Sequence, residues 1–113
     1  FFKDRVSACV AAGISRDMLI LDIGFGFGKT ADHNLTLINR LHEFSEFGLP
    51  LLVGLSRKST ISRIAEDSLS GSLAGALVAA ERGARIIRVH DVAETVSAMR
   101  VWRSIQAERI IDE

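Results

Sequence analysis

The sequence has little cysteine and no excess of charge of either sign. Its single cysteine, Cys9, cannot form a disulfide within the chain, which fits a reducing compartment; its apolar helical neighbours make it a small core residue without a role. The 14 Lys and Arg residues balance 14 Asp and Glu, so charge gives no case for nucleic acid or a membrane surface as a partner. If the protein binds phosphate, we therefore expect a few cationic side chains gathered at one site to do so, and not a basic surface.

The sequence also lacks a run of about 18 apolar residues and a charged-then-apolar leader, so we expect no membrane-spanning segment and no export. A cytoplasmic location follows by default. The content of 48% hydrophobic and 25% charged residues suits a globular fold. At the start, an amphipathic helical pattern is already under way, formed by Phe2, Val6, Val10 and Ile14. The chain opens at Phe1 without Met, which indicates a truncated chain.

Three apolar runs predict buried strands, and each strand is followed by a polar loop and a helical pattern. The predicted strands are residues 18–22, 49–55 and 84–89, and two of the helices are residues 31–47 and 68–82. Glycines end three helical patterns, at Gly13, Gly48 and Gly83. In the final helix, apolar residues recur every three positions, at Val96, Met99, Trp102 and Ile105.

Strand, loop and helix in three repeats predict an α/β fold with a parallel sheet beneath helices. Periodicity alone does not separate a barrel from an open, doubly wound sheet. Three strands are too few to close a barrel, so we expect the rest of the sheet upstream. At the start of the last helix, Asp91 and Glu94 have the spacing of a capping box.

Polar side chains collect where the three predicted strands end, which is the edge where both architectures bind ligands. Taken singly, each is explained as a turn acid, a solvated loop residue or a helix cap. Arg88 and His90 are two residues apart and therefore share a strand face, which favours an anion site, whereas Ile87 and Val89 face the other way. The whole set comprises Asp22, Ser56, Arg57, Lys58, Ser59, Arg88, His90 and Asp91.

The glycine-rich segment 22–30 matches two phosphate-binding motifs incompletely. A Walker loop needs a glycine at position 23, where the chain has Ile23, so the nucleotide triphosphatase hypothesis fails. A dinucleotide fingerprint is satisfied by Gly26, Gly28 and Ala31 after a strand and before a helix.

Two charged residues bear on the dinucleotide hypothesis. Arg57 after the next strand is placed to meet a 2′-phosphate. Against it, Asp22 would set a carboxylate beside the pyrophosphate with no cation evident, which is unfavourable. A carboxylate fits a ring with two adjacent N–H groups, such as a 2-amino-4-oxo pyrimidine, better than it fits a pyrophosphate. The two carboxylate oxygens can accept the two N–H hydrogen bonds side by side.

Four segments resemble dihydropteroate synthase in order and spacing. They are Leu-Asp-Ile-Gly-Phe-Gly-Phe-Gly-Lys at 21–29, Leu-Pro-Leu-Leu-Val-Gly-Leu-Ser-Arg-Lys-Ser at 49–59, Gly-Ser-Leu-Ala at 71–74 and Ile-Ile-Arg-Val-His-Asp-Val at 86–92. The resemblance runs through nearly the whole chain. It implies an α/β protein with a (β/α)8 TIM barrel, of which residues 1–113 are the last three βα units, strands 6 to 8 of a single pterin-binding domain, with Phe1 inside the fifth helix.

The resemblance implies a transferase. The family joins p-aminobenzoate to 6-hydroxymethyl-7,8-dihydropterin pyrophosphate, with Mg²⁺, and releases pyrophosphate and 7,8-dihydropteroate for folate biosynthesis. By the same resemblance, the protein is a homodimer through its last helices. The small residues Gly71, Ala74 and Gly75 would allow close packing, either against a partner or within the barrel.

The resemblance also implies roles at the pterin and pyrophosphate sites. Asp22 accepts hydrogen bonds from the pterin ring, Lys58 reaches its polar edge, and Gly54 lets the ring approach the strand backbone. Arg88 packs over the ring and, with His90, holds the departing pyrophosphate.

At the p-aminobenzoate site, the resemblance implies that Phe27 and Lys58 form the border and that the carboxylate lies near Ser59, at a helix N-terminus. The predicted catalytic residues are Lys58, Arg88 and His90. The predicted substrate-binding set is Asp22, Phe27, Gly54, Lys58, Ser59, Arg88, Val89 and His90.

The chain departs from the family pattern in two places. Ile23 stands where the family usually has proline, and the connection from Ile64 to Ser70 is short. The asparagine that binds Mg²⁺ is expected upstream, so this chain alone is predicted to be inactive and to hold no metal ligand. Three alternatives stay open: a pterin-binding methyltransferase domain, an NADP-binding module and a non-catalytic fragment that packs as a partner subunit. Ligand identity separates them.

Overall fold

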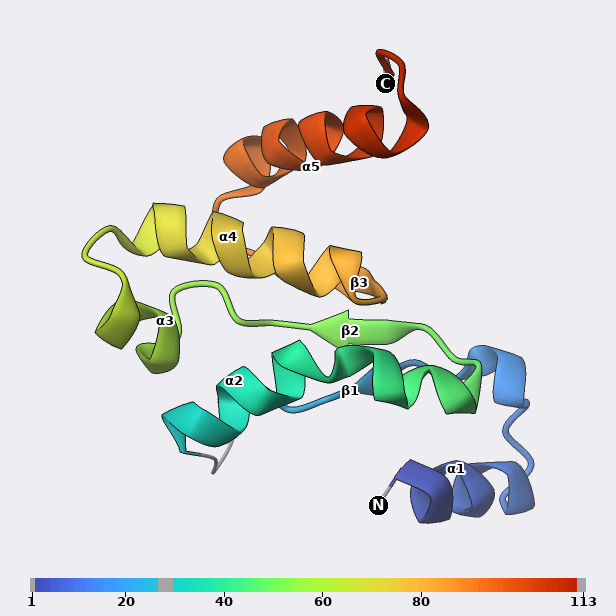
Figure 1. The fold of residues 1–113 in the computed structure, drawn as a ribbon. Coiled ribbons are helices and arrows are strands. Elements are labelled where there is room, and N and C mark those ends of the chain that lie inside the picture. The colour runs from blue at the N-terminus through green and yellow to red at the C-terminus, as the bar shows by residue number, and fades with distance from the viewer. Residues whose placement is uncertain (1, 27–29, 112–113) are drawn as a thin grey trace.

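The computed structural model describes residues 2–26 and 30–111, in which strands and helices alternate (Figure 1). The strands are β1 (Leu21–Asp22), β2 (Leu51–Val53) and β3 (Ala84–Ile87). The α-helices are α1 (Phe2–Ala11), α2 (Ala31–Asn39), α3 (Ser59–Ile64), α4 (Ser68–Glu81) and α5 (Val92–Ala107), and 3-10 helices span η1 (Arg16–Met18) and η2 (Leu41–Phe47). No helix in these ranges is both long and apolar enough to cross a membrane.

The strands form one parallel sheet in the order β1-β2-β3, which confirms the predicted α/β arrangement. Leu21 pairs with Leu51, and Val53 pairs with Ile87. Because parallel neighbours require a crossover, a helical segment lies between each pair of strands: α2 with η2, and then α3 with α4. All three strands therefore end at the same edge of the sheet.

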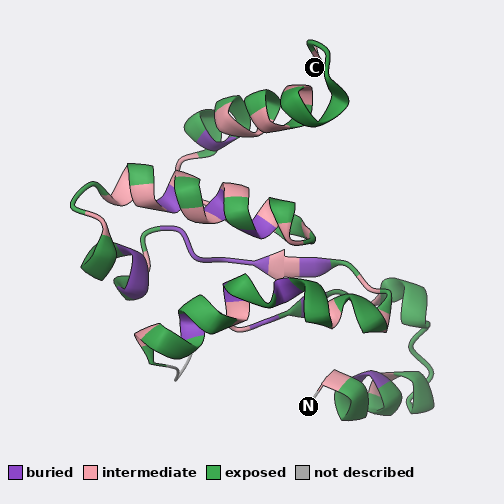
Figure 2. Cartoon of the chain, in the orientation of Figure 1, coloured by how far each residue is buried: buried purple, intermediate pink, exposed green. Residues whose placement is uncertain are grey.

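The core lies along β2 and the helices that pack against it. Leu51, Val53 and Leu55 are 3%, 0% and 2% exposed, and they belong to one cluster with Phe25 and Leu41. Figure 2 shows buried residues concentrated along β2, whereas α1 and α5 are mostly exposed. The central strand is thus the most firmly packed, and it positions the loop that follows it.

The predicted glycine stops are confirmed. Gly13 has φ +95°, its N–H donates to the Val10 carbonyl, and the Ile14 N–H donates to the Cys9 carbonyl, both at 3.0 Å. This pair of bonds is the Schellman arrangement, which needs a left-handed residue and therefore favours glycine. Gly48 likewise ends η2 in the left-handed region, at φ +62°.

The predicted strands are too long. Residues 16–18 form η1 instead of the start of β1, and Met18 is 77% exposed. In the second run, Pro50 has no N–H to donate to a ladder, and β2 begins at the next residue. An apolar run indicates which residues tend to be buried, but it does not indicate which backbone groups form the hydrogen bonds of a strand.

The predicted helix 31–47 is wrong in its second half. It leaves the α conformation at Arg40 and continues as the 3-10 helix η2. The physical reason is the spacing of Leu41, Phe44 and Phe47, because three residues per turn is the period of a 3-10 helix. The Phe2 ring of α1 packs edge-on against Phe44 and Phe47, with centroids 5.5 and 5.8 Å apart.

Helix α4 starts at Ser68 as predicted, and the Asp67 carboxylate caps it by accepting the Leu69 N–H at 3.1 Å. The short helix α3 before it was not predicted as a separate element by periodicity. The capping box at Asp91 is wrong, since the Asp91 side chain makes no cap hydrogen bond. That carboxylate binds Arg57 instead.

The last strand and helix are less buried than predicted. In β3, Ile86 is 37% exposed, and on α5 Val96 and Ile105 are 44% and 72% exposed. Among the described strands β3 pairs with β2, and α5 packs on α4, so each of these elements has one covered side. Cys9 is half-buried.

Candidate functional site

The predicted strand-end residues do meet at one edge of the sheet. Asp22 ends β1, and its Oδ2 lies 3.9 Å from Nη1 of Arg88, which follows β3. The side chains are 45% and 54% exposed, so solvent weakens their attraction and leaves both accessible to a ligand. Asp22 Oδ1 accepts the Gly24 N–H at 2.8 Å, which fixes the carboxylate at the start of the loop.

Arg88 is the cation that the sequence did not reveal beside Asp22. The electrostatic objection to a pyrophosphate near Asp22 therefore fails. The position of Arg88 also explains Gly54. A Cβ atom at Gly54 would lie 2.4 Å from Nη2 of Arg88, so the guanidinium lies directly over the backbone that follows β2.

Lys58 lies against the glycine-rich loop. Its Nζ donates to the Phe25 carbonyl at 2.6 Å, and a Cβ atom at Gly26 would lie 3.0 Å from its Cδ. The pKa of Lys58 is lowered because burial penalises the ammonium and because Arg88 repels it, while Asp22 acts in the opposite direction. Lys58, Arg88 and Asp22 therefore form one electrostatically linked group.

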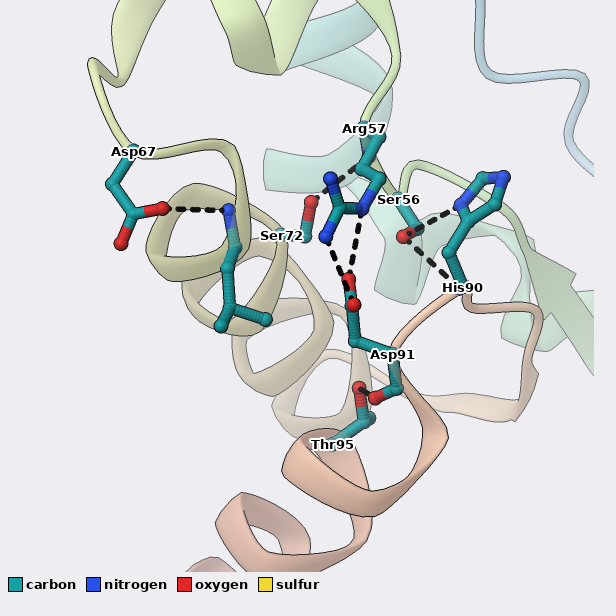
Figure 3. Close-up of polar contacts among 8 residues, drawn as sticks. Ser56, Arg57, Asp67, Ser72, His90, Asp91 and Thr95 are labelled. Atoms are coloured by element: carbon teal, nitrogen blue, oxygen red, sulfur yellow. Dashed lines mark hydrogen bonds and ion pairs between the residues drawn. The ribbon is translucent and has the colours of Figure 1, made fainter.

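Arg57 is held rather than available to a phosphate. Its Nε and Nη2 donate to the two carboxylate oxygens of Asp91, both at 2.9 Å, and its backbone N–H donates to Ser72 Oγ at 2.9 Å (Figure 3). Arg57 has φ +55°, a left-handed conformation that costs a non-glycine residue energy. The hydrogen bond from Arg57 holds the pKa of Asp91 below its ordinary value.

His90 is hydrogen-bonded to the segment that follows β2. Its backbone N–H donates to Ser56 Oγ at 3.2 Å, and its Nδ1 lies 3.0 Å from the same oxygen (Figure 3). Strand β3 ends at Ile87, so Arg88 and His90 lie in the segment after the strand and not on it as predicted. Ile87 and Val89 line a hollow between β3 and α5, which Arg88 and His90 do not line. Any contact of Val89 with a ligand at the Arg88 face would therefore run through its backbone.

The remaining predicted residues are placed as follows. Ser59 is exposed and is the first residue of α3, which agrees with its predicted place at a helix N-terminus. Phe27 lies outside the described residues. Gly71 and Gly75 pack inside the protein, because a Cβ atom would lie 2.7 Å from Ala65 Cβ and 2.6 Å from Leu55 Cδ1 respectively.

A buried polar link beneath the glycine-rich loop was not predicted from the sequence. Asn34 is 2% exposed; its Oδ1 accepts the Gly26 N–H and its Nδ2 donates to Thr60 Oγ1, both at 2.9 Å. The link fixes the loop on which Lys58 rests. A signal was present, because Asn34 shares the apolar helix face of Ile38 and Leu41 at spacings of four and seven.

Within residues 2–26 and 30–111, no group of three or more His, Cys, Asp or Glu side chains is arranged to hold a metal ion. The described part of the chain thus offers anion-binding cations and a carboxylate, but it does not fit a metal centre of its own.

Comparison with known proteins identifies the family. The model of the pterin-binding enzyme family matches residues 1–90. The dihydropteroate synthase of Escherichia coli is 55% identical over 105 residues, which cover 89% of this chain and 37% of the relative. That of Haemophilus influenzae is 46% identical, over 92% of this chain and 39% of the relative. The chain thus spans about two fifths of the length of these curated relatives.

Solved structures of dihydropteroate synthases have the same fold. The Yersinia pestis enzyme superposes with a TM-score of 0.91 at 48% identity, over 95% of this chain and 46% of that one. The Xanthomonas albilineans enzyme, in complex with 7,8-dihydropteroate, superposes with a TM-score of 0.92 at 45% identity, over 95% of this chain and 43% of that one. This confirms the predicted fold class, in which the three βα units are those of a TIM barrel. The chain therefore belongs to the family of pterin-binding enzymes, and the relatives that it resembles within that family are dihydropteroate synthases.

Proposed function

We propose that the full-length protein containing this chain is a dihydropteroate synthase. It would condense 6-hydroxymethyl-7,8-dihydropterin pyrophosphate with p-aminobenzoate to give 7,8-dihydropteroate and pyrophosphate. Curated relatives at 46% to 55% identity carry that name. Solved relatives at 45% identity hold 7,8-dihydropteroate in one case and 4-aminobenzoic acid in another. We also propose that residues 1–113 are the C-terminal portion of a single barrel domain, with strands 6 to 8.

The observation that carries the proposal is the grouping of one carboxylate with two cations at the strand ends. Asp22 Oδ2 lies 3.9 Å from Nη1 of Arg88. The charges of both residues shift the pKa of Lys58, Arg88 lowering it and Asp22 raising it. A carboxylate recognises the adjacent N–H groups of a pterin ring, and a guanidinium recognises phosphate oxygens. A ligand with both parts, such as a pterin pyrophosphate, matches this pair at one site.

In the proposed assignment, Asp22 binds the pterin ring, and Gly54 keeps the strand backbone clear beside it. Lys58 lies between the ring and the p-aminobenzoate site, whose carboxylate is near Ser59. Arg88 and His90 donate hydrogen bonds to the pyrophosphate. Phe27 and Val89 complete the proposed substrate-binding set.

The chemistry requires charge stabilisation more than a strong base. The bond from the pterin methylene carbon to the pyrophosphate oxygen breaks first, and the electron pair leaves with pyrophosphate. Arg88 and His90 stabilise this negative charge, while the electron-rich pterin carries the positive charge left on the methylene. The nitrogen lone pair of the free arylamine then forms the C–N bond, and the product amine loses one N–H proton to solvent. His90 therefore acts as an anion donor in this scheme.

Three further features are proposed from the family resemblance. Mg²⁺ would neutralise pyrophosphate charge and would be bound by residues outside this chain. The protein would be a homodimer through its last helices. It would work in the cytoplasm, where the single Cys9 stays reduced.

The proposal is tested by incubating the full-length protein with both substrates and detecting 7,8-dihydropteroate and pyrophosphate by liquid chromatography. Lys58→Gln should slow turnover, whereas Lys3→Gln, a change on the exposed surface of α1, should leave it unchanged. Methyl transfer from a methylated folate, or binding of NADP without product formation, would reject the proposal in favour of one of the alternatives.

A further inference from the structure

Two buried serines hold backbone groups near the strand ends, and one of them also contacts the imidazole of His90. Ser56 is 4% exposed and follows β2, and Ser72 is 6% exposed and lies in α4. Ser56 Oγ accepts the His90 N–H at 3.2 Å, and Ser72 Oγ accepts the Arg57 N–H at 2.9 Å. Ser56 Oγ lies, in addition, 3.0 Å from Nδ1 of His90.

The chemistry of the hydroxyl decides which atom donates in that second contact. A serine hydroxyl has one proton and two lone pairs. The backbone N–H of His90 can only donate, so it takes one lone pair. If Nδ1 carried the ring proton, the Nδ1–H group would donate to the second lone pair of the hydroxyl oxygen. The buried hydroxyl proton would then have no acceptor among the contacts described for Ser56. If Nδ1 is unprotonated, the hydroxyl donates to it, and the hydroxyl proton, the His90 N–H and Nδ1 all have partners.

We propose that Ser56 is a positioning residue that fixes neutral His90 in its Nε2–H tautomer, so that the imidazole presents a hydrogen-bond donor to an anion at the strand ends. Neutral imidazole has one donor and one acceptor nitrogen, and Ser56 engages the acceptor. In Figure 3 the other ring nitrogen points away from Ser56, and His90 is exposed. The donor therefore faces outward without any proton transfer.

The neighbouring residues keep this contact in place. Arg57 follows Ser56, Asp91 follows His90, and these two are joined by two hydrogen bonds of 2.9 Å. Farther back, the Arg88 N–H donates to the Val53 carbonyl at 3.0 Å. The imidazole thus lies between two fixed points where the chain segments after β2 and β3 are held together.

The tautomer is measurable by long-range ¹H–¹⁵N NMR of histidine rings in the full-length protein, at about pH 8.5, where imidazoles are neutral. A His90→Gln variant identifies the signals. We expect Nδ1 in the unprotonated range and Nε2 in the protonated range. Ser56→Ala should move both nitrogens toward the averaged values of exchanging tautomers.

Ser72→Ala is the matched control, because it also removes a buried hydroxyl that accepts a backbone N–H, without touching the imidazole. It should leave the His90 signals unchanged. A proton on Nδ1 in the parent overturns the proposal even if Ser56→Ala fails to fold. A Ser56→Ala spectrum identical to the parent, or an equal change in Ser72→Ala, overturns it as well.

The consequence for binding rests on the proposed function, and inorganic pyrophosphate is the probe. By calorimetry, Ser56→Ala should bind pyrophosphate about 3- to 10-fold more weakly than the parent, the effect of one hydrogen bond, and Ser72→Ala should match the parent. Equal affinities of Ser56→Ala and the parent overturn the proposal. Failure of the parent to bind pyrophosphate counts against the proposed function, and the tautomer then decides the role of Ser56.

Discussion

At the scale of single residues, the candidate site is built from charged groups that contribute little to folding. Arg88 and Asp22 are about half exposed and 3.9 Å apart, a geometry in which solvent screens most of the attraction. Substitution at either position should therefore change ligand binding more than stability, which makes the roles of these residues separable from the fold.

Asp22→Asn should weaken pterin binding by about 10- to 100-fold, because a neutral amide replaces a carboxylate that accepts two N–H bonds. Calorimetry with the pterin ligand on the full-length protein measures the loss. An Asp17→Asn variant, altered at an exposed carboxylate in η1, should bind like the parent. Unchanged affinity in Asp22→Asn would remove Asp22 from the pterin site.

Arg88→Lys and His90→Ala should both bind the pterin pyrophosphate more weakly, by about tenfold for Arg88→Lys, because lysine keeps the charge but loses the planar fork. The loss for His90→Ala should be milder. The same pterin without its phosphates should lose far less affinity. An equal loss for both ligands, or a collapse of the thermal midpoint, would make Arg88 and His90 scaffold residues.

The Arg57–Asp91 pair predicts a dependence of stability on acid. Its hydrogen bonds lower the pKa of Asp91 in the folded state below the ordinary value, so the unfolded chain binds this proton more readily. The stabilising contribution is thus fully present above about pH 4 and is lost as the pH falls through the lowered pKa.

Urea unfolding of the full-length protein at neutral pH and at about pH 3 checks this sign. Asp91→Asn should be less stable than the parent at neutral pH, and the difference should shrink in acid. Asp17→Asn should keep the acid dependence of the parent. If the difference in the free energy of unfolding between Asp91→Asn and the parent instead stays constant with pH, the Arg57–Asp91 pair is not the source of the acid dependence.

At the scale of the elements, the glycines near β2 and in α4 have different functions. A Cβ atom at Gly54 would meet the guanidinium at the end of the long Arg88 side chain, whereas at Gly71 it would meet Ala65 and Ile61 in packed contacts. Gly54→Ala should therefore displace Arg88 and weaken pyrophosphate binding with little loss of stability. Gly71→Ala should cost about 1 to 3 kcal/mol of stability through overpacking. Denaturant titration and calorimetry on both variants would separate the two effects, and a reversed pattern would contradict this assignment.

The extent to which these elements could be predicted from sequence depends on the kind of signal. Apolar runs and glycine stops predicted three parallel strands, because burial and left-handed turns are local requirements. The side-chain pairs were not predictable in this way. Asp91 has the spacing of a cap, but its carboxylate binds Arg57, 34 residues away in sequence. Asn34 likewise contacts Thr60, 26 residues away, which no local pattern encodes.

At the scale of the whole molecule, the described sheet has β1 at one edge and β3 at the other. Apolar side chains are exposed near both edges: Met18 and Ile20 before β1 are 77% and 53% exposed, and Ile86 on β3 and Val92 at the start of α5 are 37% and 61% exposed. Exposed apolar residues beside an open strand edge favour association with another chain or segment. Because the chain spans about two fifths of its curated relatives, further barrel strands are the expected cover.

Residues 1–113 produced alone should consequently be marginally stable and should self-associate, since the open strand edges and exposed apolar side chains have no cover within the described part of the chain. Sedimentation velocity should show species larger than a monomer, and thermal unfolding monitored by circular dichroism should be broad. The full-length protein should unfold cooperatively and keep β1 amides protected from hydrogen exchange. A compact monomer of residues 1–113 with a sharp transition would mean that the three βα units form a self-sufficient core, and the single-domain proposal would then fail.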